Sequence, residues 1–468
     1  MRVEGTTRFD LLVRGGTVVR VDGSRVADVG VQDGKIAAVE PGIPAEAADR
    51  VVEADGLLVL PGVIDVHTHA RLASDDEPDR FFQDSVAAAH GGTTTFLSFN
   101  NPGTGIGEAG QRTLGGGISE WLERSAGDSA IDYGLSAVIT AQQAGPIADL
   151  GAAIDAGVPT FKAFMVYDFG VDEALLARLL VATGRLPALL EIHCEDAGML
   201  DAGIRGELAA GRSAPRHHAD SRPPDVEGTG TSRAIALAAE AGAPMYVVHL
   251  SCAEALAHVA TARAGGQPVY AETCPHFLTL DASRYELPDA DAIGYVVSPP
   301  LRSHGDVDAL WGALADGTLD LVATDHVPDR LAVEKRYTGQ PFTEISNGAP
   351  GIETLLAVVY SEGVAKGRIS IERMVDLLAT TPARLFGLDS KGAIEPGRDA
   401  DLVLFDPSAR RTLRQADLHH TSDYTPYEGI KLNGAVRHVL MRGEDVIRDG
   451  AFTGRRGVGQ FQERSLKR

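Results

Sequence analysis

The chain has 468 residues, of which 44% are hydrophobic and 23% charged, and its formal net charge is −22 at pH 7. This length suffices for one large domain and a smaller one, and the composition is ordinary for a soluble globular enzyme. The acidic excess argues against non-specific binding to nucleic acid and against an anionic membrane surface.

The N-terminal segment MRVEGTTRFD lacks the apolar core of a signal peptide, and no apolar run reaches the ~18 residues that cross a bilayer. Three cysteines, Cys194, Cys252 and Cys274, are sparse and lack C-x-x-C spacing, which is typical of reduced thiols. We therefore expect a cytoplasmic protein with no membrane span and no nucleic-acid partner.

Both ends of the chain predict a small β-domain. Residues 1–60 contain short strand-like runs such as FDLLVRGGTVVR, with the hairpin signals VDG and QDG and no helical periodicity. Residues 391–455 show the same pattern, and residues 456–468 follow as a C-terminal tail. We expect the two segments to form one small β-sandwich.

Residues 61–390 alternate strand-like and helix-like runs, which predicts a parallel sheet. The strand-like runs are 60–67, 93–99, 131–139, 158–165, 187–194, 244–251, 268–274 and 320–325. The helix-like runs include 172–184, 231–242 and 252–266. Eight such strands favour an α/β fold with a closed (β/α)8 TIM barrel. The stretches 99–118 and 195–230 are expected to be long functional loops.

Residues of the metal-ligand type stand at the ends of several strand-like runs. They are His67, His69, Lys162, His193, His249 and Asp325. In a barrel, the C-terminal ends of the strands meet at one face, where active sites form. The pattern therefore predicts one metal centre to which several strands contribute.

Each histidine also has a plainer interpretation. His67 and His69 are two apart and share a strand face, but H-x-H alone is a weak signal. A single histidine such as His193 or His249 is more often a hydrogen-bonded core residue than a ligand. Their common position at strand ends favours the metal interpretation, because a buried imidazole is costly unless it is bonded or ligated.

Lys162 lies within the apolar run TFKAFMVY. The plainer interpretation is a lysine that reaches solvent or forms a salt bridge. A desolvated amine instead becomes neutral and nucleophilic. It can then take up CO₂ to form a carbamate, whose two oxygens can bridge two divalent ions.

The predicted ligands divide over two divalent ions. One ion takes His67, His69, Asp325 and the Lys162 carbamate, and the other takes the same carbamate with the pair His193 and His249. Zinc suits such nitrogen and oxygen ligands, with manganese, cobalt and nickel left open. An aspartate in this position can also take a proton from metal-bound water.

Other motifs carry less information. Gly105–Gly110 (GIGEAG) matches a dinucleotide-binding fingerprint but precedes no helix pattern, so we interpret it as a flexible loop. His217 and His218 are expected to form a solvated loop pair, and His276 and His304 are assigned structural or loop roles.

Many segments, in chain order, match one known family. They are PGVIDVHTH, GGTTTF, FKAFMVY, EIHCED, VVHLSC, ETCPHFL, VSPPLR, ATDHVP, SNGAPGIE, TPARLFGL, KGAIEPGRDADLVLFD and DYTPYEG. With these motifs the chain resembles the cyclic amidohydrolases, and most closely the hydantoinase/dihydropyrimidinase group. The resemblance extends over nearly the whole chain.

The resemblance implies roles for particular residues. Lys162 matches the carboxylated lysine, and the other five ligand-type residues match the metal ligands. Tyr167 matches the tyrosine that helps stabilise the oxyanion, and Ser298 and Asn347 match positions whose backbone groups bind the cyclic amide. Asp325 would carry a proton from the attacking hydroxide to the leaving ring nitrogen.

The expected reaction opens a hydantoin or dihydropyrimidine ring to an N-carbamoyl amino acid, through a hydroxide that bridges two metal ions. SFNNPG, EIHCED and ETCPHFL depart from the hydantoinase pattern, and the last leans towards allantoinases. An allantoinase is therefore the alternative. A non-catalytic scaffold of the same superfamily is a rival that the filled ligand positions disfavour. The resemblance also implies a homo-oligomer, a tetramer or a dimer, that acts on a small molecule.

Overall fold

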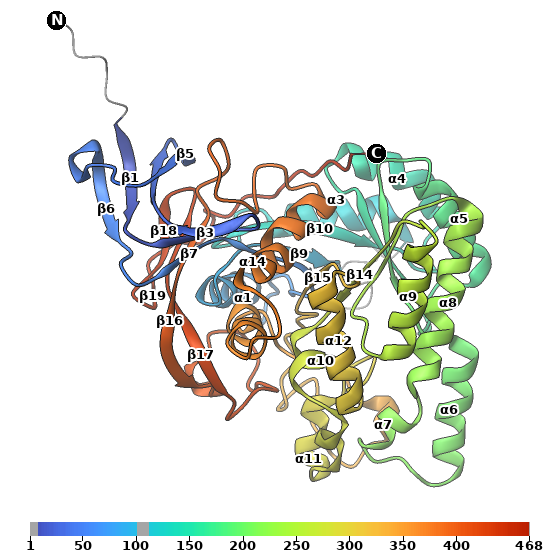
Figure 1. The fold of residues 1–468 in the computed structure, drawn as a ribbon. Helices are drawn as coiled ribbons and strands as arrows, with labels where there is room; N and C mark the ends of the chain where they lie inside the picture. The colour runs from blue at the N-terminus through green and yellow to red at the C-terminus, as the bar shows by residue number, and fades with distance from the viewer. Residues whose placement is uncertain (1–7, 101–111, 468) are drawn as a thin grey trace, which may run out of the picture.

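The computed structural model describes residues 8–100 and 112–467. Its centre is an eight-stranded parallel sheet in which each strand pairs with the preceding one in sequence (Figure 1). The strands are β8 Val63–Thr68, β9 Thr93–Phe99, β10 Asp132–Val138, β11 Thr160–Phe164, β12 Leu189–His193, β13 Met245–Val247, β14 Val269–Thr273 and β15 Leu321–Val322. They are buried and apolar because a parallel sheet is covered on both faces.

The sheet closes into a barrel where β8 meets β15, a junction that we call the seam. Thr68 and His326 form an isolated parallel bridge, and the His69 amide donates to the His326 carbonyl at 2.7 Å. Asp65 in β8 accepts from the Thr324 amide at 3.0 Å and from the Thr324 hydroxyl at 2.6 Å. The predicted (β/α)8 TIM barrel is confirmed.

Helices follow the strands and surround the barrel (Figure 1). The longer ones are α1 Arg80–His90, α3 Leu114–Ser125, α4 Pro146–Asp155, α5 Glu173–Thr183, α6 Ala197–Ala209, α8 Pro224–Ala241, α9 Ala253–Ala264 and α12 His304–Asp316. The short ones are α7 His217–Asp220, α10 Pro275–Thr279, α11 Asp289–Ala292, α13 Leu355–Val359, α14 Ile371–Val375 and α15 Thr381–Phe386. Helix α5 shows why they form: Asp172 caps the Leu175 amide at 2.7 Å, and Leu176, Leu179 and Leu180 are buried.

Short 3-10 and π turns complete the helical structure. They are η1 Ala45–Ala47, η2 Ala282–Glu286, η3 Ile293–Tyr295, η4 Phe342–Glu344, η5 Tyr360–Val364, η6 Asp376–Thr380 and η7 Gln415–Asp417.

The prediction of a long loop over residues 195–230 was wrong, because α6, α7 and the first turns of α8 lie there. Asp196 caps the Met199 amide of α6 at 2.8 Å, and Pro224 stands in the first turn of α8. Proline and aspartate at these positions begin a helix rather than break one. The predicted loop 99–118 likewise ends early, since α3 starts at Leu114, and Gly105–Gly110 lies outside the described residues.

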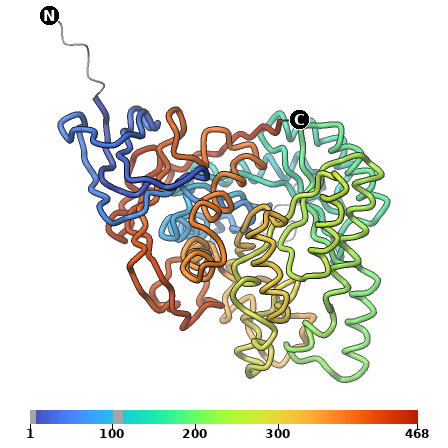
Figure 2. The backbone as a smooth tube through the Cα atoms, in the orientation of Figure 1, coloured from blue at the N-terminus to red at the C-terminus, as the bar shows by residue number. Residues whose placement is uncertain are grey.

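The two ends of the chain form two further sheets, ordered β5-β4-β1-β6 and β19-β18-β17-β16-β7-β2-β3. Their strands are β1 Phe9–Arg14, β2 Thr17–Arg20, β3 Gly23–Val26, β4 Asp28–Gln32, β5 Lys35–Glu40, β6 Ala48–Glu53, β7 Leu58–Pro61, β16 Leu402–Thr412, β17 Lys431–Met441, β18 Glu444–Arg448 and β19 Ala451–Phe452. Val13 and Val29 of one sheet share a buried core with Val59 and Leu404 of the other. The predicted β-sandwich is therefore confirmed, and Figure 2 shows its blue N-terminal and red C-terminal parts side by side.

The last residues of the chain pack against the barrel. The Gln462 amide donates to the Tyr133 carbonyl at 2.7 Å, and the buried Arg464 donates to the Thr160 hydroxyl at 2.8 Å. Both acceptors lie at the N-terminal halves of barrel strands, away from the ends that carry the ligand-type residues. Among the described helices, none has the length and apolarity that crossing a bilayer requires.

Candidate active site

The six ligand-type side chains meet at the C-terminal end of the barrel. His67, Lys162 and His193 belong to β8, β11 and β12, and His69, His249 and Asp325 follow β8, β13 and β15 directly. His67, His69 and Asp325 place ligand atoms within 4.8 Å of one another. The ring centroids of His67 and His249 are 5.4 Å apart, which joins this trio to the other strands.

Asp325 lies between the two histidines of the H-x-H motif. Its Oδ1 is 3.0 Å from His67 Nε2 and 3.2 Å from His69 Nε2. On its other side, His67 pairs through Nδ1 with the buried Glu272. Burial and Lys162 lower the pKa of His67, but Glu272 and Asp325 outweigh them and raise it to about 9. Two carboxylates that face a buried imidazole create a site for a cation.

His193 and His249 form the other half of the site. His193 Nδ1 is 3.0 Å from His249 Nε2, and His193 Nε2 is 2.6 Å from Glu195 Oε2. Burial lowers the pKa of His193, and burial with His193 and Lys162 holds that of His249 well below its usual value. Both rings are therefore neutral. A carboxylate that accepts from one ring nitrogen leaves the other nitrogen's lone pair free for a metal ion.

Lys162 is fully buried, and its Nζ has no hydrogen-bond partner among the described residues. The nearest aromatic rings, Phe99 and Phe164, have centroids 4.6 and 5.0 Å from Nζ. Burial lowers the pKa of Lys162, although Asp325 and other carboxylates oppose this effect. The neutral amine that a carbamate requires is thus favoured here.

Whether these residues fit a metal centre can be judged from the buried polar atoms that have no hydrogen-bond partner. Among the described residues, such atoms include Lys162 Nζ and His249 Nδ1. An unpaired buried donor or acceptor costs on the order of 1–3 kcal/mol, so native proteins rarely leave several together. Nitrogen and carboxylate ligands on separate strands fit divalent ions of the zinc type.

The backbone is strained at the same place. Tyr167, His249 and Asp325 have φ values of 75°, 38° and 51°, in the left-handed region that non-glycine residues rarely adopt. They are half of the non-glycine residues with positive φ in the described part of the chain. Such strain persists where the surrounding structure needs a side chain to point in one direction.

The other predicted site residues border this centre. The Tyr167 ring centroid is 5.5 Å from that of His193, and Arg222 and Ser298 oppose the rise in the Tyr167 pKa that burial causes. The Gly348 amide donates to the Val296 carbonyl at 3.0 Å, which brings the segments of Ser298 and Asn347 side by side. Tyr167 is 37% exposed, so this edge of the site is open to a small molecule.

The charged residues that orient the histidines were missed in the sequence. Glu195 holds His193, Glu272 holds His67, and Arg222 joins Glu195 to Ser298. Glu195 and Glu272 are carboxylates at the ends of apolar runs, which is the signal that identified the ligands. Arg222 gives no such signal, because it lies between two helices.

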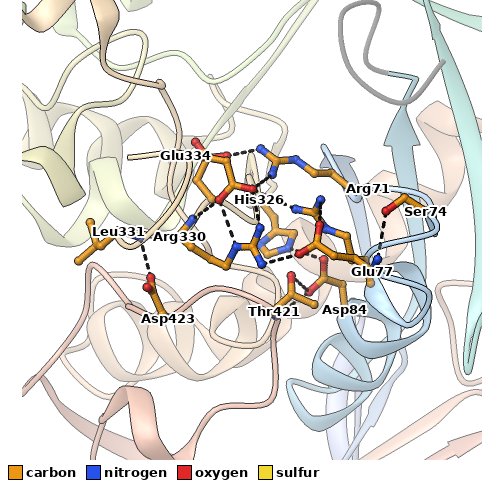
Figure 3. Close-up of polar contacts among 12 residues, drawn as sticks. Arg71, Ser74, Glu77, Asp84, His326, Arg330, Leu331, Glu334, Thr421 and Asp423 are labelled. Atoms are coloured by element: carbon orange, nitrogen blue, oxygen red, sulfur yellow. Dashed lines mark hydrogen bonds and ion pairs between the residues drawn. The ribbon is translucent and has the colours of Figure 1, made fainter. Parts of the chain in front are cut away.

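An ion cluster connects the loops that follow His69 and Asp325 (Figure 3). Arg71 pairs with Asp329 and, at 2.7 Å, with Glu334, while Arg330 pairs with Glu77 and, at 3.0 Å, with Glu334. These loops flank the seam on the active-site side. The cluster therefore fixes the separation of the two segments that supply His69 and Asp325.

Other histidines singled out in the sequence are outside the six ligand-type residues. The predicted solvated loop pair is wrong in two respects: His217 and His218 both lie in α7, and His218 is buried and pairs with the Val297 carbonyl at 2.8 Å. Burial lowers the pKa of His218 to about 3. His304 is exposed at the start of α12, and His276 is buried in α10.

A cavity of about 790 Å³ lies at the opposite end of the barrel. It is lined by Leu189, Pro268, Leu385 and Leu466, among others, and no candidate site residue is among the described residues that line it. The chemistry therefore belongs to the C-terminal end, where the titratable side chains converge.

Comparison with known proteins agrees with this geometry. The model of the Amidohydrolase family matches residues 58–446. The D-hydantoinase of Rhizobium radiobacter is 38% identical over 461 residues, which cover 97% of this chain and 99% of that protein. The D-hydantoinase of Geobacillus stearothermophilus is 39% identical over 463 residues, which cover 97% of this chain and 96% of that protein.

Solved structures give the same result. The dihydropyrimidinase of Brevibacillus agri has a TM-score of 0.92 and 39% identity, with 97% of this chain and 98% of that chain covered. The L-hydantoinase (dihydropyrimidinase) of Arthrobacter aurescens has a TM-score of 0.88 and 29% identity, with 97% and 99% covered. The chain therefore belongs to the amidohydrolase family, within its hydantoinase and dihydropyrimidinase group, and is a hydrolase that acts on carbon–nitrogen bonds, as its motifs predict.

Proposed function

We propose that this enzyme opens the ring of a hydantoin or dihydropyrimidine by hydrolysis and releases an N-carbamoyl amino acid. The observation that carries the proposal is the convergence of Lys162, Asp325 and four histidines beside Tyr167 and Ser298 at one open edge of the barrel. The names of the relatives, D-hydantoinase and dihydropyrimidinase, support this substrate class.

The candidate ligands would hold two divalent ions, for which zinc is our choice. His67, His69 and Asp325 would bind one ion, and His193 and His249 the other. Bound there, such ions would polarise the ring carbonyl and supply a hydroxide near neutral pH.

Lys162 would join the two halves as a carbamate. Its neutral amine would add to CO₂, form a nitrogen–carbon bond and release a proton, and the product would carry one negative charge shared by two oxygens. The lowered pKa of Lys162, caused by burial, supports this role because only the neutral amine is nucleophilic. Its strand β11 pairs with β12, which carries His193, and its charge also acts on His67 of β8.

Asp325 would act as the proton carrier. Burial raises the pKa of Asp325, but His67 and His69 outweigh burial and hold it well below its usual range. The carboxylate is therefore ionised and can accept the proton of the attacking water. It then passes this proton to the ring nitrogen that leaves the carbonyl carbon.

Tyr167 would stabilise the carbonyl oxygen as negative charge develops on it. Burial raises the pKa of Tyr167, which keeps its hydroxyl protonated and able to donate. A preorganised donor of this kind lowers the barrier because it needs no reorientation during the reaction. The backbone groups of Ser298 and Asn347 would bind the amide edge of the ring.

A substrate panel tests the proposal directly. Zinc-loaded enzyme in bicarbonate is assayed with hydantoin, D- and L-5-substituted hydantoins, dihydrouracil, allantoin and dihydroorotate. Opening of a hydantoin or of dihydrouracil supports the proposal, whereas hydrolysis of allantoin alone supports an allantoinase. A chain that purifies with no metal and opens none of these rings would be a non-catalytic scaffold.

We also propose that the enzyme is cytoplasmic and forms a homo-oligomer, a tetramer or a dimer, as the resemblance implies. Light scattering coupled to size-exclusion chromatography measures the mass of the assembly. A monomer at micromolar concentration would contradict this part of the proposal.

A further inference from the structure

Arg222 is the buried cation closest to the substrate side of the site. It lies between α7 and α8, and only 4% of its surface is exposed. Its NH1 donates to Glu195 Oε2 at 3.1 Å and to the Ser298 hydroxyl oxygen at 2.8 Å. Its charge also acts on the Tyr167 hydroxyl, whose pKa it lowers against the effect of burial. One guanidinium group therefore interacts with three residues that border the reaction centre.

The effect of Arg222 on Tyr167 has a defined direction. Burial raises the pKa of Tyr167, and the positive charge of Arg222 opposes this rise. A guanidinium group has only donors, so the phenol oxygen can act towards it only as an acceptor, which leaves the phenol proton for another group. Arg222 thereby favours the orientation in which Tyr167 can donate to a substrate carbonyl.

The contact with Glu195 reaches the other half of the site. Glu195 accepts from His193 Nε2 at 2.6 Å, and His193 Nδ1 faces His249. The orientation of this imidazole depends on the position of the carboxylate, and Arg222 holds the same oxygen, Oε2, at 3.1 Å.

A second buried arginine fixes Arg222 itself. Arg302 donates to the Arg222 carbonyl at 2.6 Å, to Glu227 at 3.0 Å and to the Ser251 hydroxyl at 3.0 Å. Arg302 forms no hydrogen bond with Tyr167, Ser298 or Glu195 among the described contacts. The two arginines are thus similar in burial and pairing, but only Arg222 contacts residues of the site.

We propose that Arg222 is a positioning residue that aligns Tyr167 and Ser298 on the substrate side with His193 on the metal side. This inference rests on the proposed ring-opening function. The plainer alternative is that Arg222 only neutralises the buried Glu195. The two alternatives differ in what a lysine at this position can replace, because lysine supplies the charge but not the planar fork of donors.

The test combines Arg222→Lys with Tyr167→Phe and measures kcat and KM on whichever ring the wild-type enzyme opens. We expect Arg222→Lys to lower kcat about 10–100-fold, less than the roughly 10²–10³ that loss of an oxyanion donor costs, because Tyr167 itself remains. We expect a much smaller further loss when Tyr167→Phe is already present, because Arg222 acts through that hydroxyl. Wild-type kcat and KM in Arg222→Lys, or full additivity with Tyr167→Phe, would overturn the proposal.

Two readouts do not depend on turnover. Zinc stoichiometry is expected to remain near two per chain in Arg222→Lys, and binding of an N-carbamoyl amino acid, measured by calorimetry, is expected to weaken. In Arg222→Ala, added guanidinium is expected to restore part of kcat and of this binding. Loss of zinc in Arg222→Lys with unchanged binding by the reloaded enzyme would mean a purely structural role.

Arg302→Lys is the matched control. It alters a buried, ion-paired arginine of the same network, so its effect on kcat is expected to be additive with that of Tyr167→Phe. If Arg302→Lys is coupled to Tyr167→Phe as strongly as Arg222→Lys is, the specific role of Arg222 is overturned. If the wild-type enzyme opens no ring, the proposed function is rejected instead. The calorimetric measurement of N-carbamoyl amino acid binding then still tests the role of Arg222.

Discussion

The two halves of the candidate metal centre are held in different ways. His193 stands in a continuous parallel ladder, where β11, β12 and β13 pair in regular register and Phe164 lies opposite His193. His67, His69 and Asp325 stand at the seam, where one isolated bridge joins β8 to the segment after β15. A regular ladder of backbone hydrogen bonds positions His193, whereas at the seam side chains supplement the single His69–His326 backbone hydrogen bond.

The seam shows how those side chains do so. Asp65 and Thr324 form the hydrogen bonds that a ladder would otherwise supply, and the ion cluster of Arg71, Glu334 and Arg330 ties the loops above them (Figure 3). A barrel closed in this way can place Asp325 independently of the strand register. This arrangement would suit the proton carrier that we propose Asp325 to be, while a regular ladder would suit candidate ligands that only need to stay fixed.

The largest expected effect is at the seam. Asp325→Asn removes the proton acceptor and one candidate ligand, so kcat should fall by about 10²–10⁴. Steady-state kinetics of the metal-loaded variant measure this loss. Asp329→Asn, a buried carboxylate four residues further on that pairs with Arg71, should lose far less activity. Equal losses would mean that Asp325 matters only for the closure of the seam.

The next effect concerns Lys162, which we propose connects the two halves as a carbamate. Lys162→Ala should lose metal and activity, and short carboxylic acids should restore part of both, because they can replace the carbamate. Metal analysis and kcat with added acetate or propionate measure this. Lys335→Ala is the matched control: Lys335 is also buried, but its Nζ donates to the Val296 carbonyl at 2.8 Å, so acids should not rescue it. Full activity of Lys162→Ala would reject the carbamate.

A smaller effect should distinguish metal binding by the two halves of the centre. Glu272→Gln and Glu195→Gln each remove a charge that orients one histidine, His67 or His193, and each should weaken metal binding about 10–100-fold. A competition titration with a chelator resolves the two binding steps. We expect each substitution to weaken a different step. If both weaken the same step, the ions do not divide between the halves as proposed.

The smallest effect should come from the ion cluster. Arg71→Met breaks the pairs with Asp329 and Glu334, and should destabilise the fold by about 1–3 kcal/mol, because Asp329 is fully buried. Hydrogen exchange should accelerate in residues 69–79 and 327–336 but not in β11–β13. The exposed Arg233–Glu173 pair is the control, and Arg233→Met should change stability by less than about 1 kcal/mol. Faster exchange in β11–β13 would show that the halves are not held separately.

The sequence identified the ligands because each interrupts an apolar strand run with an imidazole, amine or carboxylate. The same reasoning could have identified Glu195 and Glu272, which occupy similar positions. It could not identify Arg222, because a charged residue in a proline-rich connection cannot be distinguished in the sequence from the many solvent-exposed charged residues of loops. Nor could it show that residues 195–230 are helical, because Pro223 and Pro224 begin a helix there and resemble loop residues in the sequence alone.

The sequence by itself determined the barrel, the sandwich and the six candidate ligands, because apolar periodicity and strand-end chemistry are local properties of the chain. Only the tertiary structure decided which groups hold those ligands. Glu272 reaches His67 across 205 positions, and Arg222 reaches Ser298 across 76. Such pairs depend on how the strands close around the barrel, and the closure at the seam is made by side chains that no local pattern in the sequence pairs.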